Sequence, residues 1–159
     1  MNLPELEIRP LNSSEEIPFE LLLLADDEIQ AIEKYIYRSE VLVANAPMSK
    51  APIGVIALLP IDSSILEIKA LAVSTIFHNQ GIGKRLIATA KRIACERGFR
   101  ELHVGTADCA FKELDFYTRC GFQRFAVKHN FFIENYTKPL FENGIQLKDM
   151  VMFRILLSY

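Results

Sequence analysis

The amino-acid sequence predicts a single α+β domain over residues 1–159, built on a mixed, mostly antiparallel sheet flanked by helices. A chain of 159 residues has the length of one ordinary domain. Half of its residues are apolar and 24% are charged, so it can build a packed core. The spacing of the apolar residues changes along the chain from strand-like to helix-like, which favours a sheet and helices packed together.

The first half of the chain predicts one strand, two helices and three further strands. Leu6–Arg9 alternates apolar and charged residues, which is the period of a half-buried strand. Between Phe19 and Tyr37 the apolar residues recur at helical spacing, and Asp26 is placed to cap the second of two helices. Three strand-like runs separated by short turns then predict an antiparallel meander over Glu40–Ala46, Pro52–Leu59 and Ile65–Ser74.

The second half begins with a long amphipathic helix. Its apolar stripe runs from Ile82 to Ala94, and Gly98 stands where a helix C-terminal glycine belongs. A strand, a short helix and two strands are then expected over Glu101–Thr106, Phe111–Arg119, Phe122–Phe132 and Met150–Leu157. An aromatic, polar loop, Ile133–Leu147, separates the last two strands, and the predicted order is β-α-α-β-β-β-α-β-α-β-β.

Charge and composition argue against several classes of function. The formal net charge is −2 and the Lys and Arg residues are scattered, so neither nucleic acid nor a membrane surface is an expected partner. No run is long enough to span a membrane, and Met1–Pro10 lacks the pattern of a secretory signal. Because Cys95, Cys109 and Cys120 have no metal-ligand spacing, we expect reduced, mostly buried thiols, no metal and a cytoplasmic location.

The most informative segment joins the last strand of the meander to the long helix. Leu71-Ala72-Val73 lies near the end of the strand, and the turn His78-Asn79-Gln80-Gly81-Ile82-Gly83 opens the helix. The first N–H groups of a helix have no internal partner, its dipole favours negative charge there, and glycine lets an anion approach the backbone. The junction is therefore a candidate anion site. Alternatively, Gly81 and Gly83 only let the helix start pack tightly on the sheet.

Two familiar phosphate-binding patterns do not fit this turn. A nucleotide P-loop requires Gly at its first position and Ser or Thr at its last, where this chain has His78 and Arg85. A dinucleotide fingerprint requires a third Gly, where the chain has Leu86. The pattern that fits is Gln/Arg-x-x-Gly-x-Gly/Ala, and from Leu6 to the C-terminus the sequence resembles the superfamily that carries it, the GNAT N-acetyltransferases.

This resemblance implies a cofactor and the residues that bind it. In the superfamily the turn holds the diphosphate of acetyl-CoA, which is the acyl donor, mainly through backbone N–H groups. The first position is usually Gln or Arg and is His78 here, so the role of that side chain stays open. The implied cofactor-binding residues are Leu71, Ala72, Val73, His78, Asn79, Gln80, Gly81, Ile82, Gly83, Lys84 and Tyr117.

A second segment, Asp115–Phe122, resembles the other signature of the superfamily, Phe-Tyr-x-Lys/Arg-x-Gly-Phe. The resemblance implies that the Tyr117 hydroxyl faces the cofactor sulfur and protonates the departing thiolate. The ordinary pKa values of a phenol and a thiol lie within about two units, so this transfer is reasonable. Alternatively, Tyr117 is an aromatic core residue at a helix end. An Asn that contacts the cofactor in many relatives is Ala110 here, so that contact is absent or passes to Asp108 or Thr106.

Acyl transfer to an amine also needs a group that takes the ammonium proton. Glu67 lies on the strand leading to the cofactor turn, and resemblance to the histone-modifying branch implies that this position can carry the general base. An equally weighted alternative makes Glu67 and Lys69 the outward residues of a strand, and His129 and Glu134 are competing bases. No protein nucleophile is expected: the amine attacks the thioester directly in a ternary complex, and the backbone N–H at or near Val73 polarises the carbonyl.

The acceptor is expected to be a primary amine of a small molecule or peptide. Its choice in the superfamily comes from the first two helices, here Phe19–Arg38, and from loops near the last strands. Glu142–Ile145 followed by Lys148–Met150 resembles a bacterial subgroup in which some members carry the label indole-acetate acetyltransferase, although indole-acetate has no basic amine to acylate. The late aromatics are expected to line an acceptor pocket, to form a subunit contact in a homodimer or to belong to the core, and they are Phe131, Phe132, Tyr136 and Phe141. The alternative functions are a non-catalytic acyl-CoA sensor or interaction module and a structural homodimer with a vestigial pocket.

Overall fold

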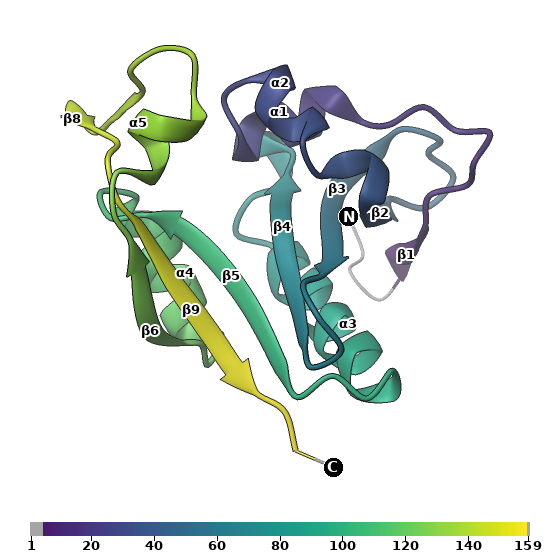
Figure 1. The fold of residues 1–159 in the computed structure, drawn as a ribbon. Helices are drawn as coiled ribbons and strands as arrows, with labels where there is room; N and C mark the ends of the chain where they lie inside the picture. The colour runs from purple at the N-terminus through teal and green to yellow at the C-terminus, as the bar shows by residue number, and fades with distance from the viewer. Residues whose placement is uncertain (1–4, 159) are drawn as a thin grey trace. The chain divides into compact units, whose positions relative to one another are not determined.

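The computed structural model describes residues 5–158, which form two compact units. The first comprises the described chain up to Pro60 together with Ile68–Ile93, and the second comprises Ile61–Glu67 together with the chain from Ala94 onward. Each unit is a layer of strands with helices packed on it (Figure 1). The single domain expected over residues 1–159 stays a prediction.

The strands of the first unit lie in the order β1-β2-β3-β4. Their bounds are β1 Glu7–Pro10, β2 Glu40–Asn45, β3 Pro52–Pro60 and β4 Ile65–Val73, of which β4 begins in the second unit. β1 pairs antiparallel with β2, and β2 pairs antiparallel with β3. Nearly every residue of β2 and β3 is buried, which requires that both faces of this layer be covered.

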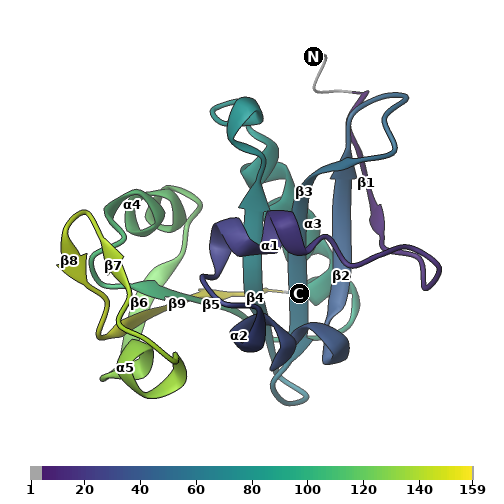
Figure 2. The same cartoon turned by 90° about the horizontal axis from the view of Figure 1, so that it is seen from above.

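Helices cover the two faces of this layer. α1 (Phe19–Ala25) and α2 (Ile29–Glu33), followed by a 3-10 turn at Ile36–Arg38, lie on one face, and α3 (Ile82–Glu96) lies on the other (Figure 2). A Cβ atom at Gly54 of β3 would lie 3.2 Å from Leu86 Cδ1, so glycine at that position lets α3 approach the sheet closely. The amphipathic pattern of α3 therefore has the partner that the sequence predicts for it.

The predicted cap at Asp26 is wrong. The residue that precedes α2 is Glu28, which makes no side-chain capping hydrogen bond. Asp26 instead follows α1, where its carboxylate accepts hydrogen bonds from Asp27 N at 3.0 Å and from the Tyr35 hydroxyl at 3.3 Å. An Asp at this place serves the connection between the two helices because its short side chain bonds its own neighbourhood.

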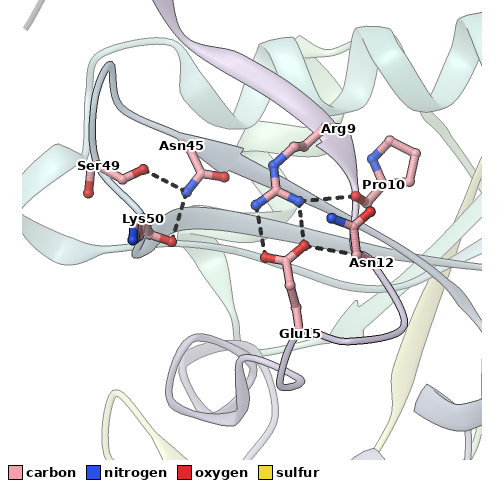
Figure 3. Close-up of polar contacts among 7 residues, drawn as sticks. All are labelled: Arg9, Pro10, Asn12, Glu15, Asn45, Ser49 and Lys50. Atoms are coloured by element: carbon pink, nitrogen blue, oxygen red, sulfur yellow. Dashed lines mark hydrogen bonds and ion pairs between the residues drawn. The ribbon is translucent and has the colours of Figure 1, made fainter.

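Two groups of polar contacts, one around Arg9 and one around Asn45, lie in the first unit (Figure 3). Arg9 Nη1 lies 2.6 Å from Glu15 Oε1, and the hydrogen bond from this guanidinium lowers the pKa of Glu15 to about 2. Asn45 Nδ2 donates to Ser49 O and Lys50 O, which closes the turn between β2 and β3. The Oδ1 atom of Asn45 is buried without a hydrogen-bond partner in the described residues.

The strands of the second unit lie in the order β5-β9-β6, with both ladders antiparallel. They span Glu101–Ala107, Met150–Leu156 and Gln123–Lys128, and α4 spans Phe111–Arg119 as predicted. In this part of the chain β6 pairs with β9 alone, all of its residues are exposed, and its register shifts between Arg124 and Ala126. The predicted α+β class with a mostly antiparallel sheet is confirmed.

The segment between β6 and β9 departs from the prediction. The strand expected over Phe122–Phe132 ends at Lys128, because Asn130 adopts a left-handed backbone with φ 56° and Phe131 begins α5 (Phe131–Asn135). The expected loop also contains the hairpin β7–β8, Phe141–Glu142 and Ile145–Gln146. A small core holds this segment in place and comprises Ala107, Cys109, Ala110, Phe132, Leu140 and Leu147. Over residues 5–158, no helix has the length and apolar character needed to cross a membrane.

Candidate active site

The predicted cofactor turn leaves the end of β4 in the first unit. Ser74 N donates to Ile53 O of β3 at 2.8 Å, which fixes the chain directly after Val73. Ala72 is buried in the core shared with α1 and α2, whereas Val73 is half-buried. The strand is thus anchored through one face and through the backbone, so its end is a rigid support for the cofactor turn.

Two residues of the turn have a left-handed backbone, Asn79 with φ 63° and Gly81 with φ 79°. Asn tolerates this region and Gly enters it freely. A Cβ atom placed at Gly81 meets no heavy atom of the described residues within 4 Å. Tight packing of the helix on the sheet therefore does not explain Gly81. The glycine supplies a positive φ and leaves its backbone accessible to a ligand.

The first turn of α3 has the charge pattern of an anion site. It contains no acidic residue, although Asp and Glu are the residues that the helix dipole favours there. Lys84 is exposed, while Arg85 is half-buried and its guanidinium donates to Leu6 O at 3.4 Å. The first intrahelical bond runs from Arg85 N to Gly81 O at 3.1 Å, so the preceding N–H groups are those that a helix leaves unpaired. Buried Ile82 anchors this start of the helix in the core.

The side chain of His78 contacts the end of β4. Its Nε2 atom lies 2.8 Å from Val73 O although the residue itself is exposed. A carbonyl can only accept, so the bond requires hydrogen on Nε2. The sequence leaves His78 without a role, and this contact is one that the one-dimensional pattern does not show.

Tyr117 lies in the second unit, near the C-terminal end of α4, with 6% of its surface exposed. Its ring makes edge-to-face contacts with Phe116 and Phe122 at centroid distances of 5.3 and 5.6 Å, and a tilted contact with Phe153 at 6.0 Å. The ring is therefore a core residue, as one alternative predicts. Within residues 5–158 its hydroxyl makes no hydrogen bond, so the packing of the ring in the core leaves the hydroxyl available to a ligand.

Burial raises the pKa of Tyr117 well above its ordinary value, and the nearby Glu113 and Cys120 raise it further. The phenol is consequently protonated at neutral pH. A protonated hydroxyl can donate to a departing thiolate, and the acid role of Tyr117 stays a prediction.

The candidate bases differ in burial. Glu67 of β4 is 6% exposed, so it is not an outward, solvated residue of the strand. Lys69 is half-buried, with its Nζ atom 5.8 Å from the centroid of the Tyr35 ring. The His129 side chain is 76% exposed, with Nδ1 3.4 Å from Asp149 Oδ2, and Glu134 is exposed on α5. Burial singles out Glu67 among the three.

The remaining predicted groups are unevenly placed. Ala110 is the buried residue that precedes α4, whereas Asp108 is exposed and Thr106 is half-buried. None of the three cysteines, all within the described residues, forms a disulfide, and of these only Cys109 is buried, so the expectation of mostly buried thiols is wrong for the other two. Within residues 5–158, no cluster of three or more His, Cys, Asp or Glu side chains could hold a metal ion.

Comparison with known proteins identifies the family. The family model described as "Acetyltransferase (GNAT) family" matches residues 7–122. The Bacillus subtilis protein "Uncharacterized N-acetyltransferase YvbK" is 34% identical over 151 residues, which cover 95% of this chain and 96% of that protein. The chain therefore belongs to the GNAT family, and its class is that of the acetyltransferases.

Two solved structures are similar over almost the whole chain. A GNAT acetyltransferase from Elizabethkingia anophelis with acetyl-CoA bound is 34% identical, with a TM-score of 0.91 and coverage of 96% of this chain and 99% of that one. The "IAA acetyltransferase" of Bacillus cereus is also 34% identical, with a TM-score of 0.87 and the same coverage. The predicted family, fold and enzyme class are confirmed.

Proposed function

We propose that this acetyltransferase moves an acetyl group from acetyl-CoA to a primary amine of a small molecule or peptide. The observation that carries the proposal is the junction between β4 and α3, where an accessible left-handed glycine precedes a helix start without acidic residues. Such a start presents unpaired N–H groups and a positive dipole end to an anion. The acetyl-CoA bound by the similar Elizabethkingia anophelis enzyme supplies a matching diphosphate.

The cofactor role extends along the chain on either side of this junction. Leu71, Ala72 and Val73 supply strand backbone to the pantetheine arm and thioester, and the Val73 N–H polarises the carbonyl. The diphosphate lies against the backbone from His78 to Lys84, with the exposed Lys84 ammonium adding charge. Asn79, Gln80 and Gly83 shape the turn, while Ile82 anchors it.

The reaction is a direct transfer. The neutral amine nitrogen attacks the thioester carbon, a C–N bond forms, the C–S bond breaks, and the amine proton passes to Glu67, directly or through a water. The Tyr117 hydroxyl gives its proton to the departing sulfur, so CoA leaves as the thiol. The Tyr117 phenolate then takes a proton from water, and Glu67 releases its proton to solvent. Tyr117 is available for this because its hydroxyl is protonated at neutral pH. Of the candidate bases, Glu67 is the buried one.

Two measurements test the function. Calorimetry with CoA asks whether the cofactor binds, and release of free thiol from acetyl-CoA, followed across a panel of amines and peptides, asks whether it is turned over. We expect binding and amine-dependent thiol release. Binding without turnover on any acceptor would support the sensor instead, and no binding at all would support a structural role.

The amine acceptor, a homodimer and a cytoplasmic location are also part of the proposal. The similar Bacillus cereus protein is called "IAA acetyltransferase", but an acid without a basic amine gives this reaction no nucleophile, so amines come first in the panel. Sedimentation at increasing concentration tests for a homodimer, and fractionation of cells tests for a cytoplasmic location.

A further inference from the structure

We propose that His78 is a positioning residue that sets the cofactor turn relative to the end of β4 by donating a hydrogen bond from Nε2 to the Val73 carbonyl. This inference rests on the proposed function, because it assigns a role within the same cofactor site. The contact is 2.8 Å long and joins residues that lie five positions apart.

The hydrogen bond closes a loop of the chain that runs from Val73 to His78 and back through the imidazole. From Val73 the chain passes through the 3-10 turn Thr75–Phe77, in which Phe77 N donates to Ser74 O at 2.9 Å and His78 N donates to Thr75 O at 3.3 Å. The imidazole then reaches back to the starting carbonyl. Every link in this connection is short, so the position of His78 is fixed with respect to the strand.

Fixing His78 also restrains the residues directly after it in the chain. The next residue, Asn79, and then Gly81 carry the two positive φ angles of the turn. A turn made of such residues can adopt many backbone conformations when His78 is not held in place. Each conformation directs the N–H groups at the start of α3 differently. The tether reduces the number of these conformations before a ligand arrives, which is preorganisation.

One cofactor molecule has to satisfy both ends of this connection. In the proposed site, Val73 N–H meets the thioester and the turn meets the diphosphate, so the distance between them must suit acetyl-CoA. His78 is the side chain that joins the strand end to the turn, through the N–H donor at Nε2. A side-chain amide can donate in the same way, whereas an aromatic ring without N–H cannot.

The test compares His78→Gln, which keeps a donor, with His78→Phe, which keeps a planar ring without one. Binding of CoA is measured by calorimetry, and the thermal midpoint of each free protein is measured beside it. We expect His78→Phe to weaken CoA binding roughly threefold to tenfold, the value of one hydrogen bond, and His78→Gln to restore most of the affinity. Ile76→Ala is the matched control, since Ile76 is exposed in the same connection and makes no tether.

The outcomes separate this inference from the function on which it rests. Wild-type affinity in His78→Phe would overturn the tether alone. Equal losses in His78→Gln and His78→Phe would also overturn it, because the imidazole rather than its donor would then matter. Failure of the wild-type protein to bind CoA would overturn the proposed function, and the positioning role with it. A fall in the thermal midpoint without a change in affinity would assign His78 to stability only.

Discussion

The junction between β4 and α3 and the junction between β5 and α4, at each of which a strand leads into a helix, are built in opposite ways. Between β4 and α3 the chain is mostly exposed, the glycine at its end has no neighbour for a Cβ atom, and the helix start carries Lys84 and no acid. Between β5 and α4 the chain is short and passes through buried Cys109 and Ala110, and α4 has Glu113 in its first turn.

The second junction is also covered by its own unit. Asn143 of the β7–β8 hairpin donates to Cys109 O at 3.2 Å, and Asp108 N donates to Asp149 O at 3.1 Å. Both helices have unpaired N–H groups at the start, so the helix start by itself does not distinguish a ligand site. Accessibility and local charge do distinguish it, and only the α3 junction has both in favour of an anion.

The largest effect is expected at the opposite end of α4, where Tyr117 lies. Tyr117→Phe keeps the packing against Phe122 and Phe153 but removes the hydroxyl that we propose protonates the departing thiolate. Turnover should fall by about a hundredfold or more, as for the loss of one group that acts on the reacting atoms. Affinity for CoA should change little, so a single titration beside the rate measurement separates the two effects. Equal losses in both would mean that Tyr117 binds rather than activates.

A second change replaces the glycine at the junction between β4 and α3. Gly81→Ala places a side chain at φ 79°. The matched variant Gly98→Ala places one at φ 81°, just after the C-terminal end of α3. At both positions an added Cβ atom meets no heavy atom of the described residues within 4 Å. Both should lose about 1–2 kcal/mol of stability from the left-handed backbone. Only Gly81→Ala should weaken CoA binding, by roughly tenfold, because its Cβ atom occupies the approach of the diphosphate. Chemical denaturation and calorimetry together check this, and equal affinity in the two variants would contradict it.

A third change gives the start of α3 an acidic residue, as the start of α4 already has. Lys84→Glu puts an acid into the first turn of α3, as Glu113 is in α4. The helix dipole should stabilise the free protein slightly, by about 0.3–1 kcal/mol, while affinity for CoA falls about fivefold. Lys112→Glu makes the same change in the first turn of α4 and should leave CoA binding intact. The prediction fails if both variants bind CoA equally.

The smallest effect is expected on stability at low pH, through Asp149, which lies beside the junction between β5 and α4. Asp149 accepts a hydrogen bond from Asn130 N at 2.9 Å, which together with His129 lowers its pKa. Because the pKa is lower in the folded state, the charged form stabilises folding above about pH 4 and this contribution disappears as pH falls through the folded value. Asp149→Asn should therefore flatten the decline of the thermal midpoint below about pH 4. If the thermal midpoint of Asp149→Asn falls with pH as steeply as that of the wild-type protein, Asp149 does not contribute to the loss of stability in acid.

Contiguous chemistry is what the sequence predicts best. The glycine turn is recognisable because its φ requirement and the helix start lie within a few neighbouring residues, and α4 is found over the same range in prediction and structure. Asn143-Gly144 is equally local, with φ angles of 53° and 74°, and Asn-Gly is a strong hairpin signal that would have revealed β7–β8. Asn130 likewise signals the end of β6.

Other properties depend on residues that are distant in the chain. The raised pKa of Tyr117 comes from burial that includes Phe153, on a strand about thirty-six positions later. The bond between His78 and Val73 needs a particular path of the intervening backbone and a hydrogen on one nitrogen. Neither follows from residue types, because several backbone paths fit the same residues.

The exposed strand β6 has a consequence for handling the protein. A six-residue strand that is exposed along its whole length offers its backbone to a neighbouring copy, which is how ordered aggregates begin. The register shift near Phe125 interrupts that row of groups, and Arg124 and Lys128 repel a second identical strand. Variants that straighten this shift or replace these two cations will precipitate at lower concentration, so both features should be kept in any shortened or stabilised form of the enzyme.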